Sequence, residues 1–197
     1  MKVLMLNGSP HKNGSTYTAL TVIGEELKKY GVDYEIMWVG TTPVSGCIAC
    51  SSCKQTGKCV FDDIVNQFGE KATKCDGFVF GSPVYFASVS GQIRSAMDRI
   101  FMAYRQLFKY KPIANIVCER RAGGTNAYDQ LNKYIGISNA LQVPSKYWNM
   151  MIGRNAEEVL KDEEGVQIMQ NLAKNMAWLI KVLNVAESNG IGTPENV

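Results

Sequence analysis

Short apolar runs alternate with amphipathic segments along the sequence, and this alternation limits the fold more than any other feature. The apolar runs predict strands at residues 3–6, 34–39, 77–80, 113–118 and 147–152. Helices are expected at residues 15–29, 62–72, 90–101, 126–135 and 166–185. Strands that alternate with helices form a parallel sheet covered on both faces. The pattern therefore predicts a doubly wound α/β fold of five parallel strands in the order 2-1-3-4-5.

The length of 197 residues suits one domain with a sizeable core. We expect a single domain over residues 1–186, interrupted by a cysteine-rich loop at residues 40–60. A loop of this length in a compact domain is usually functional. Residues 187–197 are rich in Gly, Pro and Asn and predict a flexible tail.

Charge and hydropathy exclude two classes of partner. The net charge is only +3, and no block of Lys or Arg stands out, so a nucleic-acid partner is not expected. The apolar run at residues 3–6 is too short for a signal peptide or a membrane span. We therefore expect a cytoplasmic protein without a membrane partner, in which the cysteines are not structural disulfides.

The loop after the first strand, residues 8–16, has the composition of an anion site. It leads into the N-terminus of a helix, where free amides and the helix dipole favour negative charge. Ser9, Ser15 and Thr16 add hydroxyl groups, and Ser15 or Thr16 is expected to cap the helix. The loop carries neither a Walker motif nor a dinucleotide fingerprint, so a terminal mononucleotide phosphate is the expected ligand. The alternative is an ordinary loop that ends in a cap.

Two further loops follow the third and fourth strands. In the loop at residues 81–86, Tyr85 and Phe86 could border a planar ring, or both could be core or interface residues. The next loop contains Gly123 and Gly124, which suit close approach of the backbone to a ring and equally suit a turn. Parallel sheets bind ligands at the carboxyl ends of their strands, so all three loops are expected at one site.

Four pieces of the chain resemble the NAD(P)H-dependent FMN reductases, a branch of the flavodoxin-like superfamily: residues 6–10, 13–16, 81–86 and 98–99. The resemblance implies a flavodoxin-like fold, with the FMN phosphate in the first loop and the isoalloxazine ring against the second. The cofactor-binding residues expected on this basis are Ser9, His11, Lys12, Asn13, Ser15, Thr16, Pro83, Val84, Tyr85, Phe86, Gly123 and Gly124. His11 departs from the family, which commonly has Arg there, and Lys12 is expected to compensate.

The most distinctive motif is a cluster of four cysteines with gaps of two, two and five residues: Cys47, Cys50, Cys53 and Cys59. Closely spaced thiolates can wrap an iron–sulfur cluster. The spacing resembles the compact motif of iron–sulfur flavoproteins, which implies a 4Fe–4S cluster held by these four residues. Structural zinc, thiol exchange and a motif retained without any metal are alternatives. Cys75 and Cys118 are expected to be small buried residues.

The resemblance implies an FMN-dependent oxidoreductase with NAD(P)H as co-substrate. A cluster would pass the electrons on, and the final acceptor is expected to be a small molecule or a protein. No side chain is expected to act as a general acid or base. A flavodoxin-like electron carrier without NAD(P)H turnover and a thiol-based redox sensor are the alternatives. The family implies a homodimer or homotetramer, in which the aromatic residues at 101–110 form an interface, a lid, or a core-facing helix end.

Overall fold

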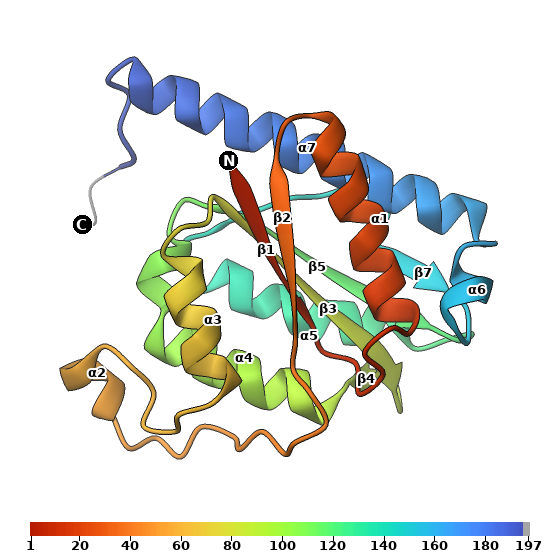
Figure 1. Ribbon diagram of the computed structural model, residues 1–197, viewed down its shortest axis with the longest axis horizontal. Coiled ribbons are helices and arrows are strands. Elements are labelled where there is room, and N and C mark those ends of the chain that lie inside the picture. The colour runs from red at the N-terminus through yellow and green to blue at the C-terminus, as the bar shows by residue number, and fades with distance from the viewer. Residues whose placement is uncertain (195–197) are drawn as a thin grey trace.

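The computed structural model describes residues 1–194 as one sheet between two layers of helices (Figure 1). The parallel strands lie in the order β2 (Asp33–Trp38), β1 (Lys2–Asn7), β3 (Gly77–Tyr85), β5 (Pro112–Glu119) and β6 (Leu141–Gln142). A second short strand, β7 (Met150–Ile152), also pairs with β5 in parallel, and β4 (Ser88–Val89) turns back antiparallel to β3.

The sheet separates two hydrophobic cores, and the central strands contribute to both. On β1, Leu4 and Leu6 belong to one core while Val3 and Met5 belong to the other. This division follows from the two-residue period of a strand, which sends successive side chains to opposite faces. Because both faces are covered, the central strands have near-continuous apolar sequences rather than alternating ones.

Three helices cover the first core and two cover the second (Figure 1). The first set is α3 (Ile64–Ala72), α4 (Gly91–Ala103) and α5 (Gly124–Gly136), and the second is α1 (Ser15–Lys29) and α7 (Glu163–Ser188). The predicted parallel sheet with helices on both faces is thereby confirmed. Across residues 1–194, no helix is both long enough and apolar enough to cross a membrane.

The strands beyond the centre differ from the prediction. The single fifth strand expected at residues 147–152 is present only as the short β7, and β6 is an additional strand; β6 pairs with the beginning of β5 and β7 with its end. Pro144, which has no amide hydrogen to donate to a ladder, lies in the segment that separates them. The strand predicted to end at residue 80 continues through Tyr85, because Ser82 and Pro83 stay in register with β5.

Local details at helix ends also depart from the prediction. Gly14, not Ser15 or Thr16, occupies the N-cap of α1, and no side chain caps that helix. The loop at residues 40–60 contains a short helix, α2 (Ser52–Thr56). The predicted tail begins inside α7, which continues through Ser188, and its last three positions, 195–197, lie outside the described residues.

The aromatic stretch after α4 faces the core. Phe101, Tyr104 and Phe108 are buried, so a core-facing helix end is correct for them and an exposed interface or lid is not. Phe108 lies on a short 3₁₀ helix (Arg105–Phe108) and packs edge-on against Phe78, with ring centroids 4.9 Å apart. The burial of these rings ties the end of α4 to the sheet.

Truncation of Phe108 to alanine is expected to lower the free energy of unfolding by about 3–5 kcal/mol, because it leaves a cavity among packed rings. Phe86→Ala is the matched control, since the Phe86 side chain is fully exposed at 105 %. That variant is expected to stay within about 0.5 kcal/mol of the parent. Urea titration followed by circular dichroism measures both; equal losses would contradict the packing described.

Candidate functional site

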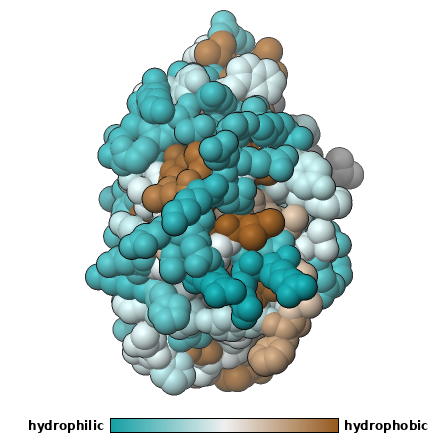
Figure 2. Space-filling model, turned by 90° about the vertical axis from the view of Figure 1, so that its right-hand side faces the viewer, coloured by the Kyte–Doolittle hydropathy of each residue, from teal (hydrophilic) through white to brown (hydrophobic). Residues whose placement is uncertain are grey.

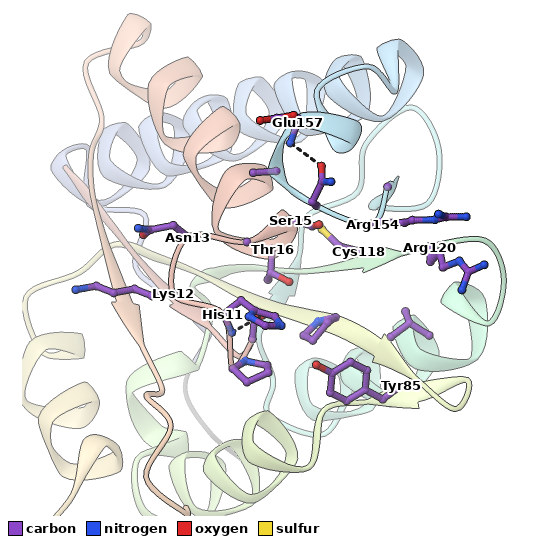
Figure 3. A pocket seen from close by; sticks show the side chains of 18 of the residues that line it. His11, Lys12, Asn13, Ser15, Thr16, Tyr85, Cys118, Arg120, Arg154 and Glu157 are labelled. Atoms are coloured by element: carbon purple, nitrogen blue, oxygen red, sulfur yellow. Dashed lines mark hydrogen bonds between the residues drawn. The ribbon is translucent and has the colours of Figure 1, made fainter.

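A cavity of about 930 Å³ lies at the carboxyl edge of the sheet, on the face that Figure 2 shows as largely hydrophilic with separate small apolar areas. The loops that follow β1, β5 and β7 enclose it, together with the last residues of β2 and β3 (Figure 3). Many of the residues expected from the sequence line it together: Ser9, His11, Lys12, Asn13, Ser15, Thr16, Pro83, Val84 and Tyr85. Its volume is that of a pocket for a small molecule or cofactor.

Hydrogen bonds within the protein hold the first loop in place. The buried Asn7 side chain accepts from the Ser9 amide at 3.0 Å and donates to the Lys12 carbonyl at 3.1 Å. Ser9 Oγ in turn accepts from the His11 amide at 3.1 Å, and the Trp38 indole donates to the Ser9 carbonyl at 2.8 Å. The loop is therefore shaped before any ligand arrives, which lowers the entropy cost of binding.

The opening of α1 has the properties of an anion site. No side chain caps its first turn, and no acidic residue lies there, so its amides are open to a ligand. Thr16 lines the cavity and is only 1 % exposed, yet its hydroxyl has no well-formed hydrogen bond within residues 1–194; it neighbours the Cys118 thiol, a weak hydrogen-bonding group. A buried hydroxyl without a partner costs free energy unless a ligand satisfies it. The residues present thus fit a phosphate group.

Cys118 lines the cavity beside Thr16 (Figure 3) but is not a reactive thiol. Burial raises the pKa of the Cys118 thiol from 9.0 to about 12. At neutral pH that shift reduces the thiolate fraction by about a thousandfold. Cys75 is also buried, so both cysteines outside the motif are small core residues, as the sequence predicts.

The wall formed by Tyr85 belongs to a tight hairpin between β3 and β4. Phe86 and Ala87 at its tip have φ values of 51° and 57°, a conformation that non-glycine residues adopt at a cost. The Asn126 side chain donates to the Ala87 carbonyl at 2.6 Å and holds the turn. Strain maintained in this way at a cavity rim positions Tyr85 firmly at the site.

Three expected residues lie outside the cavity lining: Phe86, Gly123 and Gly124. Phe86 points to solvent at the hairpin tip. At Gly123 the φ value is 95°, and a Cβ there would lie 2.9 Å from the Cα of Ala87. The Gly124 amide donates to the buried Glu119 carboxylate at 2.8 Å. The glycine pair therefore serves the packing of the hairpin against α5.

The structure also adds residues that the sequence did not indicate: Trp38, Arg120, Arg154 and Glu157. Trp38 ends β2, and Arg120 and Arg154 come just after β5 and β7, so the rule that located the loops could have found these three. The fourth, Glu157, lies on the short helix α6 (Ala156–Val159). With Lys12, the two arginines outnumber the single carboxylate, which gives the cavity a positive charge suited to phosphate-bearing ligands.

All four motif cysteines line a second cavity, of about 150 Å³, together with Arg99 and Met102. In this conformation no three His, Cys, Asp or Glu side chains within residues 1–194 are close enough together to hold a metal ion. Four thiols around one cavity are nevertheless the donor set that an iron–sulfur cluster needs. The residues therefore fit a cluster in kind and number, and closing of the loop around the metal is required.

The amino-acid sequence of the chain matches a known family and is similar to several known proteins. The family described as NADPH-dependent FMN reductase matches residues 1–154. An iron–sulfur flavoprotein of Methanocaldococcus jannaschii is 28% identical over 195 residues, covering 93% of this chain and 99% of its own. An iron–sulfur flavoprotein of Methanosarcina thermophila is 23% identical, with 93% and 97% coverage.

A flavodoxin from the domain Archaea has a similar structure, with a TM-score of 0.63 and 13% identity over 92% of this chain and 99% of that one. Identity this low shows the fold alone. Together with the strand order, it identifies the fold as flavodoxin-like.

Replacement of Thr16 by valine tests the anion site. The free protein is expected to be equally stable or more stable by up to about 1 kcal/mol, because a buried hydroxyl without a partner is lost. The dissociation constant for FMN is expected to rise about tenfold, the loss of one hydrogen bond to a charged group.

Thr21→Val on the same helix is the control, since that hydroxyl bonds the Tyr17 carbonyl away from the cavity. Quenching of FMN fluorescence measures affinity, and thermal melting measures stability. Unchanged FMN affinity in Thr16→Val would exclude this hydroxyl from the phosphate site.

Proposed function

The chain belongs to the NADPH-dependent FMN reductase family and is an FMN-dependent flavin oxidoreductase. From that premise we propose that the carboxyl-edge cavity binds FMN and NADPH, and that the cysteine loop carries a 4Fe–4S cluster. The observation that carries the proposal is the buried, unpartnered Thr16 hydroxyl at the opening of α1, inside a positively charged cavity.

The residues of the first loop would hold the FMN phosphate. Ser9, Ser15 and Thr16 supply hydroxyl groups, and the first amides of α1 supply the remaining donors. Lys12 adds a positive charge, and its ammonium lies 5.8 Å from the centre of the Trp38 ring. His11 and Asn13 complete this wall of the cavity.

The second wall would border the flavin ring. Pro83 and Val84 carry the backbone past the cavity, and Tyr85 closes it on the hairpin side (Figure 3). Bound FMN would supply the hydride-accepting chemistry toward a reduced nicotinamide. The protein's part is to orient the two rings and to exclude water, so no general acid or base is required of these side chains.

The cluster proposal rests on four thiols around one cavity and on the name iron–sulfur flavoprotein carried by relatives that match almost the whole chain. Cys47, Cys50, Cys53 and Cys59 would be the ligands. In this proposal FMN would take two electrons from NADPH, and the cluster would pass them on one at a time. The acceptor of these single electrons would be a small molecule or a protein.

Assembly and location are also proposed rather than observed. A homodimer or homotetramer is supported by an exposed apolar strip on α7, which includes Trp178, Val182 and Val185. A cytoplasmic location suits free thiols, and all six cysteines are free.

Arg120 and Arg154 are expected to bind phosphate groups of NADPH. They come from different loops, line the same cavity, and take part in none of the ion pairs within residues 1–194. Replacing both with glutamine is expected to raise the KM for NADPH about tenfold or more, because charged hydrogen bonds to phosphate are lost.

The control is Arg121→Gln, whose exposed side chain neighbours Arg120 but does not line the cavity. Steady-state oxidation of NADPH with saturating FMN gives the KM, and FMN fluorescence confirms that flavin affinity is retained. If the double variant kept the parental KM for NADPH, Arg120 and Arg154 would not belong to the NADPH site. If the FMN-loaded parent oxidised neither NADH nor NADPH, the protein would instead be a flavodoxin-like electron carrier.

Anaerobically purified protein is expected to contain about four iron and four sulfide per chain. Cys50→Ser should lose most of the iron, because one of four ligands is removed, while Cys75→Ser should keep it, since Cys75 is buried outside the motif. Elemental analysis and the visible absorption spectrum provide the measurements. Zinc in place of iron, or a metal-free yellow protein, would reject the cluster and favour a structural or thiol-based role for the loop.

A further inference from the structure

The cysteine cavity contains a buried arginine that the proposed function has not used. Arg99 lies on α4, is only 1 % exposed, and heads the fully buried side chains by volume. A charge buried to this degree is unfavourable unless it is paired and hydrogen-bonded. The partners of this guanidinium therefore indicate what it is for.

Four of its contacts are those of a structural anchor. The two terminal nitrogens donate to the two carboxylate oxygens of Asp63 at 2.6 and 2.8 Å. They also donate to the carbonyls of Ser45 and Phe61, at 3.3 and 3.2 Å. The guanidinium stacks over the Phe61 ring with its carbon 4.8 Å from the ring centre. These bonds join both ends of the cysteine loop to α4.

The fifth donor has a different partner. Arg99 Nε donates to the sulfur of Cys59 at 3.1 Å. All five N–H groups of the guanidinium are thus used, four on oxygen atoms and one on a sulfur, which is a weak acceptor. That last contact links the anchor directly to one of the four motif thiols.

Cys59 is also the motif cysteine that the fold fixes most firmly. The Asn66 side chain accepts from its amide and donates to its carbonyl, each at 3.0 Å. Cys47 and Cys50 are exposed on a segment without regular structure. Cys53 lies on α2, and its sulfur has a single long contact, 4.0 Å to the Met102 carbonyl. Among the four motif cysteines, Cys59 is therefore the one whose backbone and sulfur are both held by side chains of the surrounding fold.

We propose that Arg99 is a positioning residue that orients the Cys59 sulfur toward the cysteine cavity and raises the reduction potential of the cluster bound there. The inference rests on the proposed iron–sulfur function. A hydrogen bond and a positive charge at a ligating sulfur stabilise the reduced cluster, which carries one more electron than the oxidised one. The fixed geometry of Cys59 makes that interaction permanent.

The test compares midpoint potentials of the cluster in the parent, Arg99→Gln and Arg99→Lys. Dithionite in the presence of mediators supplies the electron, and electron paramagnetic resonance follows the reduced cluster. Glutamine removes the charge, and lysine keeps it but cannot serve Asp63 and Cys59 together. We expect the glutamine variant to lose about tenfold in the equilibrium constant for reduction, about 59 mV for one electron. The lysine variant should fall between the two.

Arg94→Gln is the matched control, because it is the same substitution on the same helix and its side chain contacts Ser88 and Gln130, away from the cysteines. Iron and sulfide analysis of the parent comes first, and absence of a cluster there rejects the proposed function rather than this inference. An Arg99→Gln variant that contains the cluster and has the parental midpoint potential would overturn the inference.

A glutamine variant that does not load leaves the decision to the lysine variant. A lowered potential in Arg99→Lys supports the role of the Nε–sulfur contact, and the parental potential overturns it. Both variants could lose iron while circular dichroism shows that they are folded. Arg99 would then be needed for the cluster to be incorporated, and its role in setting the potential would be overturned.

Discussion

The close contact between β1 and β3 at the carboxyl end of β1 is the constraint on which the site depends. The Gly8 amide donates to the Gly81 carbonyl at 2.8 Å, which carries the parallel ladder past the last residue of β1. A Cβ on Gly8 would lie 2.5 Å from Ile93, and one on Gly81 would lie 2.9 Å from Thr16. Two glycines at this point allow the first loop, the third strand and the openings of α1 and α4 to meet. The free amides of α1 and the wall that carries Tyr85 are brought together as a result.

The two cavities are constructed in different ways, and their chemistry follows from the difference. The first loop is fixed by Asn7 and Trp38 before a ligand binds, as suits a cofactor held throughout turnover. The cysteine loop is attached through Arg99 and Asn66, and none of its four thiols is in a disulfide. A loop anchored in this way can close around a metal that assembles after folding.

Sequence reasoning was accurate where a short stretch of chain determines its own structure. It gave the bounds of α1 and the positions of the central strands and the first loop, because apolar periodicity and glycine spacing are local properties. It was wrong where pairing between distant strands decides the outcome. Register with β5 extended β3 through Tyr85. Packing also decided among the alternatives that the sequence left open for Phe101 and Phe108, which lie in the core.

The sequence by itself determined the layered α/β architecture, the phosphate-type loop and the presence of four closely spaced thiols, since each is encoded in contiguous residues. Only the tertiary structure decided that Arg120 and Arg154 share a cavity, that Phe86 faces solvent, and that Arg99 reaches a sulfur 40 positions earlier in the chain. The physical reason is that a buried charge takes its partners from whatever packs around it, and that environment exists only after the helices have docked on the sheet.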